Sequence, residues 1–277
     1  PGIHLGVWRR EGRLAVWGTL SSVPSFCFVL EVAAPGLLVV KDSRGEETGK
    51  FVNVAVLEGD RIKVLDERAA RLPECPDLLA TLLGFDQRIP SPEAVGILAQ
   101  LAVSMRAHGR GGSLLVVPTG SEGWRESILP HIPYPVAPPF AGLADIVGEE
   151  GDARLRAGGR DALRHSVEAL AGLTAVDGAT VITFGYEVLA FGAKIMRRRG
   201  AAPVEAVTVL EPVEGTVPST VDATQLGGTR HQSAAQFVND QHEALALVAS
   251  QDGRFTIFAW SAPAQRVTAY RVEALLL

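Results

Sequence analysis

The chain has 277 residues, 47% of them hydrophobic, and a formal net charge of −5, so it can form one large or two ordinary domains, and its acidic balance argues against a nucleic-acid-binding surface. Its two cysteines, Cys27 and Cys75, are too few and too far apart for a disulfide framework or a thiolate zinc cage, which suits a reducing cytoplasm. The longest apolar runs have the length of strands, so we expect a soluble cytoplasmic protein without a membrane-spanning segment.

The first part of the chain predicts a small, mostly antiparallel β domain. Val7 and Trp8 on one side and residues 14–17 on the other flank a turn, which is the pattern of a hairpin. Four further strand-like runs follow at residues 26–30, 36–40, 50–56 and 61–65, separated by polar turn residues. Trp8 and Trp17 either line a ligand pocket or pack across the hairpin.

Four prolines then mark a connector: Pro73, Pro76, Pro90 and Pro92. The connector divides the chain into a first domain of residues 1–88 and a second of residues 89–277. Pro92 opens a predicted helix that ends near residue 109, and residues 112–117 follow as a buried strand, a succession typical of an α/β sheet. Residues 119–159 are irregular and rich in proline, and predict a lid, an inserted element or a disordered loop.

A carboxylate stands where the next predicted hairpin begins. A helix from Asp161 leads to Val176-Asp177-Gly178-Ala179, and strands at residues 180–184 and 187–191 follow. Glycine and alanine leave the backbone beside Asp177 almost without side-chain bulk, so a flat ligand can lie there. The alternative is an ordinary Asp-Gly turn. The basic run at Lys194 and residues 197–199 predicts a solvated helix end or, secondarily, a phosphate attractor.

The run Gly227-Gly228-Thr229-Arg230-His231-Gln232-Ser233 precedes residues with helical spacing, so it predicts a helix N-terminus. Free backbone N–H groups, the helix dipole, a guanidinium and an imidazole together favour a phosphate site. The alternative is a glycine turn capped by Thr229 or Ser233. Strands at residues 244–249 and 255–258 then flank the turn Ser250-Gln251-Asp252-Gly253.

Three polar groups therefore stand in order, each at the end of a predicted strand or helix: Asp177-Gly178-Ala179, Gly228-Thr229-Arg230-His231 and Ser250-Gln251-Asp252. The set resembles the signatures of the diadenylate cyclase domain, which are Asp-Gly-Ala, then Gly-Thr-Arg-His-Arg, then Ser-x-Glu. The resemblance covers roughly residues 92–277 and implies an α/β fold with a mixed central sheet flanked by helices. The run at residues 49–54 resembles, more weakly, an Asn-Val-bearing sensor domain that precedes such cyclases. A β domain that only docks and braces the cyclase is the alternative.

By matching positions, the resemblance implies that Asp177 acts with Mg²⁺ or Mn²⁺ on the ribose 3′-hydroxyl of ATP, while Gly178 and Ala179 lie against the nucleotide. The implied triphosphate ligands are Gly228, Thr229, Arg230, His231 and Ser233. Ser250 and Asp252 complete the phosphate and metal side, so the implied metal ligands are Asp177 and Asp252, and the implied catalytic residues are Asp177, Arg230 and His231. Phosphoryl transfer needs such groups to activate a hydroxyl and hold a pyrophosphate. The resemblance also implies a homodimer or higher homo-oligomer, in which two ATP sites face each other.

The chain departs from the family pattern in three places. Gln232 stands where the family has a second arginine, which removes a positive charge and a bidentate phosphate contact. Asp252 is one methylene shorter than the family's glutamate, and Val176 replaces a frequent histidine. A catalytically silent domain that senses ATP or a cyclic dinucleotide is therefore the second hypothesis, and an unrelated α/β scaffold protein the third.

Overall fold

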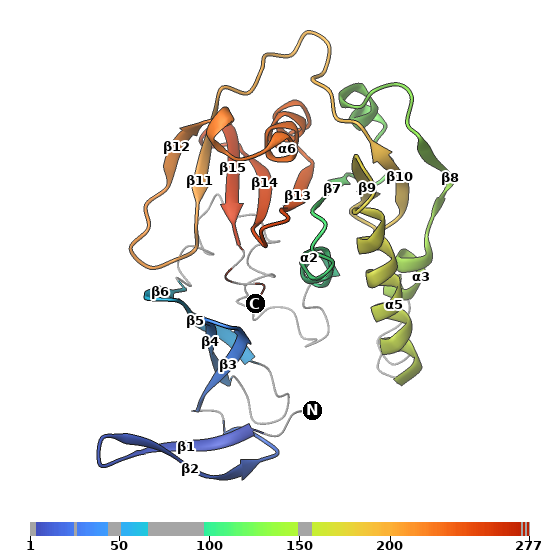
Figure 1. Ribbon diagram of the computed structural model, residues 1–277. Coiled ribbons are helices and arrows are strands. Elements are labelled where there is room, and N and C mark those ends of the chain that lie inside the picture. The colour runs from blue at the N-terminus through green and yellow to red at the C-terminus, as the bar shows by residue number, and fades with distance from the viewer. Residues whose placement is uncertain are drawn as a thin grey trace.

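The computed structural model describes residues 4–24, 27–43, 51–65, 97–148 and 157–272, together with residues 274 and 276. A nine-stranded mixed sheet with helices on both faces forms its larger part, and two smaller antiparallel sheets precede it along the chain (Figure 1). The predicted α/β fold is confirmed. The predicted boundary at residue 88 and the connector prolines lie outside the described residues.

The order of strands across the large sheet brings distant parts of the chain together. The order is β12 (Ser219–Asp222), β11 (Ala206–Leu210), β15 (Arg266–Arg271), β14 (Phe255–Ser261), β13 (Leu245–Ala249), β7 (Gly112–Val117), β9 (Ala179–Thr183), β10 (Val188–Ala193) and β8 (Tyr134–Phe140). The pairs β7–β9 and β11–β15 are parallel and the others are antiparallel. Every residue of β7 and β13 is buried, as expected for central strands covered on both faces.

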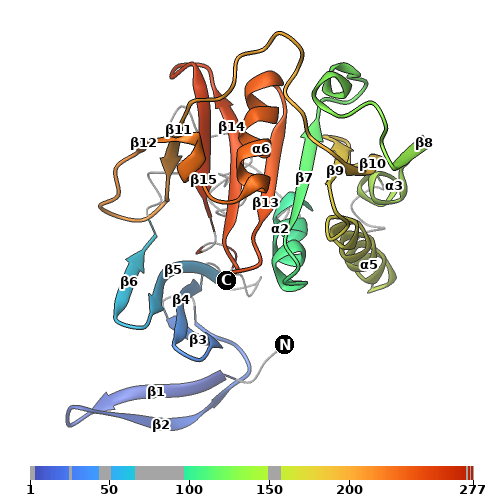
Figure 2. The same cartoon turned by 45° about the horizontal axis from the view of Figure 1, so that its top comes forward.

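Helices cover the two faces unequally (Figure 2). On one face, α2 (Ile97–Ala107), α3 (Gly142–Gly148) and α5 (Ala157–Leu173) pack on a core that includes Leu114 and Val116. On the other face, α6 (Thr229–Asp240) packs with Ala235, Phe237 and Val238 against the alternate residues of the same strands, such as Leu115 and Val117. Among the described residues, no helix is both long and apolar enough to cross a bilayer.

The proline-rich stretch after β7 has structure of its own. It contains the 3₁₀ helix η3 (Gly123–Ser127), strand β8 and helix α3. Pro135, Pro138 and Pro139 all lie in β8, which is one of the two edge strands of the sheet and, among the described strands, pairs with β10 alone. An edge strand tolerates proline because its missing N–H groups face away from the sheet. Of the three alternatives predicted for this stretch, the described part fits the inserted element.

The N-terminal β residues form two pieces where the sequence predicts one. Strands β1 (His4–Arg10) and β2 (Arg13–Leu20) make an isolated two-stranded hairpin. Strands β3 (Phe28–Ala34), β4 (Leu37–Ser43), β5 (Phe51–Glu58) and β6 (Arg61–Val64) make a separate antiparallel sheet. Trp17 lies against Gly6 across the hairpin, while Trp8 pairs with Ala15, and neither ring lines a cavity that the structure describes.

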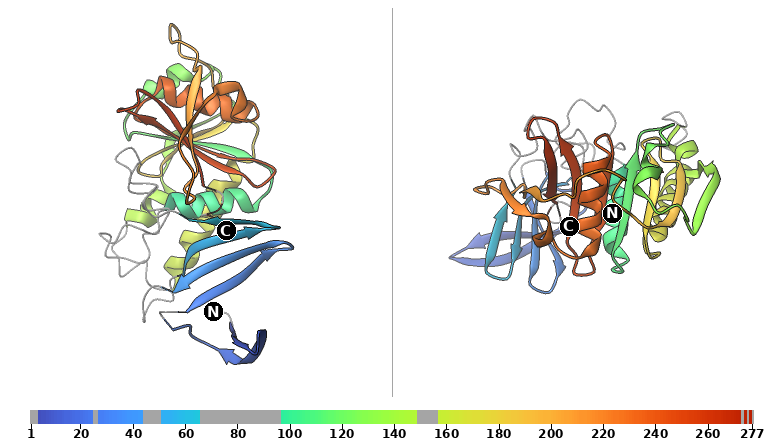
Figure 3. Two further views of the ribbon diagram at one scale, coloured as in Figure 1. Left: turned by 90° about the vertical axis from the view of Figure 1, so that its left-hand side faces the viewer. Right: turned by 90° about the horizontal axis from the view of Figure 1, so that it is seen from above.

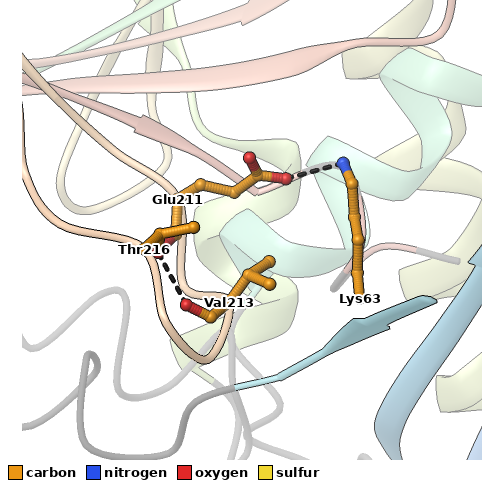
Figure 4. A network of polar contacts seen from close by, with 4 residues as sticks. All are labelled: Lys63, Glu211, Val213 and Thr216. Atoms are coloured by element: carbon orange, nitrogen blue, oxygen red, sulfur yellow. Dashed lines mark hydrogen bonds and ion pairs between the residues drawn. The ribbon is translucent and has the colours of Figure 1, made fainter. Parts of the chain in front are cut away.

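The four-stranded sheet is attached to the segment between β11 and β12 (Figure 4). Lys63 Nζ lies 2.7 Å from Glu211 Oε1, and the backbone N–H of Glu214 donates to the carbonyl oxygen of Val64 over 2.7 Å. Val213 forms a β-bridge with Leu65 and joins a small apolar core with Val39 and Val56. The inner face of the sheet is thus covered by the C-terminal part of the chain, as the side view also shows (Figure 3).

Candidate functional site

Strand register places two of the three polar segments beside the start of β7. Gly112 pairs with Ala249, the last residue of β13, and Ser113 pairs with Ala179, the first residue of β9. The residues that follow β13 and the residues that precede β9 therefore lie on either side of the first residues of β7. The start of helix α6 completes this arrangement from the neighbouring face of the sheet.

The three segments line one cavity of about 670 Å³, a size typical of sites for small ligands. All ten residues singled out in the sequence contribute to its wall: Asp177, Gly178, Ala179, Gly228, Thr229, Arg230, His231, Ser233, Ser250 and Asp252. Residues not singled out complete it: Ser113, Ala193, Lys194, Ile195, Ala249 and Gln251. The grouping of the segments follows the sequence prediction, whereas the roles of the residues stay predictions.

Asp177 presents its carboxylate at the open side of the cavity, where 88% of the side chain is exposed. Lys194 Nζ donates a hydrogen bond to Asp177 Oδ2. This bond and the charge of Lys194 lower the pKa of Asp177, and the charge of Arg230 lowers it further. Asp177 is therefore ionised and solvent-accessible at neutral pH, as the predicted roles of base or metal ligand require.

The glycine after Asp177 is required by the close approach of two backbones. Gly178 has φ +110°, and a Cβ there would lie 2.6 Å from the carbonyl oxygen of Gly192 in the neighbouring strand β10. The glycine beside Asp177 is thus explained by the packing of its backbone against β10. The flat surface for a planar ligand stays a prediction.

The start of α6 has the properties of an anion site. Its N-cap is Gly228, which makes no side-chain capping bond, and its first turn contains no acidic residue. The alternative of a turn capped by Thr229 or Ser233 is therefore wrong; Ser233 Oγ instead donates to the carbonyl oxygen of Thr229 over 2.8 Å. The guanidinium of Arg230 reaches the turn before β7, as shown by the distance of 2.9 Å between Arg230 Nη1 and the position that a Cβ on Gly111 would take. Uncapped N–H groups and a guanidinium together favour a phosphate group.

His231 forms the floor of the cavity rather than an exposed phosphate contact. It is 8% exposed, and its ring stands edge-on to Phe258 at 6.1 Å between centroids. Burial lowers the pKa of His231; the charge of Asp252 opposes this shift, and the charges of Arg271, Arg254 and Arg230 add to it. A neutral imidazole is thus favoured in the folded protein.

This lowered pKa predicts a loss of stability on acidification. Below the unfolded pKa of 6.5, the unfolded chain protonates His231 while the folded protein resists protonation. The free energy of unfolding is therefore highest above pH 6.5 and falls as the pH falls through the lower folded pKa. We expect urea unfolding of His231→Gln to show a shallower fall over this range than the wild type. The control is His165→Gln, at an exposed position on α5; equal slopes in both variants would contradict the assignment.

Sequence reasoning placed Lys194 in a basic run and missed its contact with Asp177. The run predicts a solvated helix end or, secondarily, a phosphate attractor; the structure places Lys194 directly after strand β10, so the helix end is wrong, while the phosphate role stays a prediction. The pairing of Ala193 with Ala179 puts Lys194 beside Asp177. The signal that could have found it is the register of the predicted hairpin, although two irregularities shift that register.

We expect Lys194→Met to raise the pKa of Asp177 toward its ordinary value, because Lys194 supplies both the hydrogen bond and the largest charge effect. A carboxyl-carbon NMR titration of Asp177 measures the change. Arg230→Met should raise the same pKa by less, since Arg230 acts only through its charge. An unchanged pKa in Lys194→Met would show that the ion pair does not persist in solution.

The third segment supplies a second carboxylate to the cavity. Asp252 Oδ2 lies 3.5 Å from Arg254 Nε, and Asp252 Oδ1 accepts from the backbone N–H of Arg254. No group of three or more His, Cys, Asp or Glu side chains that could hold a metal ion occurs in the part of the chain that the structure describes. Mg²⁺ commonly takes one or two protein carboxylates and completes its shell with phosphate oxygens and water. Asp177 and Asp252 both line the cavity, and their role as metal ligands stays a prediction.

Gln232, which stands where the family pattern has an arginine, is absent from the cavity wall. Its Nε2 donates to the carbonyl oxygen of Gly227 over 3.2 Å and so holds the glycine turn. Gly227 itself has φ +140°, a conformation that glycine adopts readily. The side chain therefore acts on the shape of the turn.

Comparison of the sequence with protein-family models and with curated proteins finds no match. The cavity itself, through its residues, their charges and their arrangement, is therefore the feature that points to a function.

Proposed function

We propose that the chain is a diadenylate cyclase that joins two ATP molecules into cyclic di-AMP and releases two pyrophosphates. The observation that carries the proposal is the single cavity in which Asp177, Arg230 and Asp252 meet, although they are far apart in sequence. The carboxylate of Asp177 is suited to a sugar hydroxyl. The uncapped start of α6, together with the guanidinium of Arg230, is suited to a polyphosphate.

In the proposed reaction each copy of the protein holds one ATP. The 3′-oxygen of one ribose attacks the α-phosphorus of the ATP in the other copy. A new P–O bond forms, the bond from the α-phosphorus to the β-bridging oxygen breaks, and pyrophosphate leaves with that electron pair. The hydroxyl proton passes to the carboxylate of Asp177. A second, equivalent step closes the ring.

Different residues of the chain would carry out the different parts of this reaction. The N–H groups at the start of α6, together with Thr229 and Arg230, hold the leaving pyrophosphate and offset its charge. Mg²⁺ or Mn²⁺, bound through Asp177 and Asp252, would supply Lewis-acid stabilisation of the phosphate charge. The main chain at Gly178 supports the nucleoside. The exposure of Asp177 leaves it accessible to the nucleotide of a second copy, so the proposal includes a homodimer, and it also includes a cytoplasmic location where ATP is present.

A second candidate is a silent domain that binds ATP or a cyclic dinucleotide as a sensor. Two observations favour it: the ammonium of Lys194 already occupies the position beside Asp177 that a metal ion would take, and Gln232 holds a turn in place of a phosphate. Both functions need the same anion site. They differ in whether Asp177 activates a hydroxyl.

The experiment that separates them is incubation of the purified protein with ATP and Mn²⁺, followed by chromatography for a cyclic dinucleotide. We expect one cyclic dinucleotide and two pyrophosphates for every two ATP molecules consumed. The sensor instead gives ATP-dependent thermal stabilisation with no product. If neither product nor stabilisation is observed, both proposals are rejected.

A further inference from the structure

The face of the four-stranded sheet that points away from the large sheet is apolar. Residues opposite each other in an antiparallel sheet share a face, and the register gives two complete rows. One row is Val32, Leu38, Leu57 and Ile62, and the other is Leu30, Val40, Ala55 and Val64. With Phe28, these residues define the outer face. Neither row contains a charged residue.

The outer face of the sheet is exposed to solvent, whereas the inner face is covered. Val39 and Val56, on the inner face, are 0% and 3% exposed, because they pack with Val213. On the outer face, Val32 is 71% exposed and Ile62 is 68% exposed. An antiparallel sheet with one face in water normally carries polar residues on that face, whereas the exposed face of this sheet carries apolar rows.

The β1–β2 hairpin adds a second unpartnered apolar surface at the same end of the molecule (Figures 1 and 3). Its two strands pack chiefly on each other among the described elements. Six large apolar side chains are more than half exposed: Leu5, Val7, Trp8, Leu14, Val16 and Trp17. A two-stranded hairpin is marginally stable in water on its own, so such a composition indicates that another surface covers it.

We propose that two copies of this chain associate through the outer faces of their four-stranded sheets and through their β1–β2 hairpins. The area fits a second copy: the exposed apolar side chains of both pieces amount to roughly 1,000 Å² in each chain, and a stable interface needs about 800 Å² from each partner. A two-fold axis brings the same patch of both copies together, so no separate complementary surface is required.

The charge of the chain also favours a second copy as the partner that covers the outer face. The chain carries a net charge of −5, so two copies repel each other over most of their surfaces. The two outer-face rows carry no charge, so they can meet without opposing like charges; the charged residues Asp42, opposite Phe28, and Arg9, Arg10 and Arg13 of the hairpin lie outside these rows. Two sheets that stack in this way lie about 10 Å apart and bury the apolar rows between them. This association does not depend on nucleotide or on the proposed reaction.

The test is the molar mass of the nucleotide-free protein by sedimentation equilibrium over a wide concentration range. We expect Val32→Glu to halve the mass relative to the wild type, because it places a charge in each copy within the apolar interface. Val217→Glu is the matched control: Val217 is 81% exposed in the segment between β11 and β12, away from the outer face, and its substitution should leave the mass unchanged. Circular dichroism verifies that each variant is folded.

A second variant decides the matter if Val32→Glu does not fold. Leu14→Glu changes a hairpin residue that is 79% exposed, so it disturbs no contact within one copy, and we again expect half the wild-type mass. A wild type with the mass of one chain overturns the proposal, and so does a folded Val32→Glu or Leu14→Glu variant that keeps the wild-type mass. A halved mass in Val217→Glu also overturns it, since the effect would then follow from charge alone.

Discussion

Asp177→Asn is expected to lower the rate of cyclic di-AMP formation by about 10²–10⁴-fold, the usual contribution of a positioned general base. Asparagine keeps the shape of the side chain but neither accepts the proton of the ribose hydroxyl nor binds a divalent cation as a carboxylate does. Binding of ATP should persist, because Arg230 and the start of α6 remain. The measurement is the initial rate of product formation together with nucleotide-dependent thermal stabilisation.

The matched control is Asp161→Asn, which removes an exposed carboxylate on α5, outside the cavity wall. Its rate should equal that of the wild type. An Asp177→Asn protein with the wild-type rate would show that another group accepts the proton. A variant that loses ATP binding and activity together would place Asp177 in ground-state binding instead.

Gly178→Ala is expected to destabilise the protein by about 2–5 kcal/mol, since it combines a left-handed backbone with a steric clash. Gly178 has φ +110°, and the new Cβ would lie 2.6 Å from the carbonyl oxygen of Gly192 and closer still to its carbonyl carbon. Both atoms are main chain in a sheet, so no side-chain rotation relieves the contact. Strands β9 and β10 must separate, which also opens the wall beside Asp177.

Gly200→Ala isolates the steric part of this effect. Gly200 has φ +82°, but a Cβ there meets nothing within 4 Å. Its substitution should lower the free energy of unfolding by about 1 kcal/mol, the cost of the backbone conformation alone. Urea unfolding of both variants measures the difference, and equal losses would contradict a close approach of Gly178 to Gly192.

The parts of the site that sequence could predict are those set by local pattern. The hairpin that follows Asp177, the buried strand β7 and the helix after Gly228 all appear as periodic apolar runs with glycine at their ends. Once these elements are assigned, the sheet edge at which the polar segments meet follows from the order of the strands. The same reasoning confirms the hairpin formed by β1 and β2.

The parts that sequence did not predict depend on contacts between distant segments. Strands β11, β12 and β15 lie at the side of the sheet farthest from β7 and carry no strong apolar alternation. Lys194 reaches Asp177 only through a hairpin register that irregularities shift. The separation of the N-terminal β residues into a hairpin and a sheet, and the bridge from Leu65 to Val213, are tertiary features with no local signal.

The register around β7 also has a consequence for folding. Gly112 meets Ala249, and Ser113 meets Ala179, so the walls of the cavity join residues that are separated by more than sixty positions along the chain. Closing such long loops slows folding, because the chain loses conformational entropy before the stabilising contacts form. The local hairpins form early by comparison, because their strands are close along the chain. The cavity therefore forms late in folding. A ligand that binds in it distinguishes fully folded molecules from compact folding intermediates.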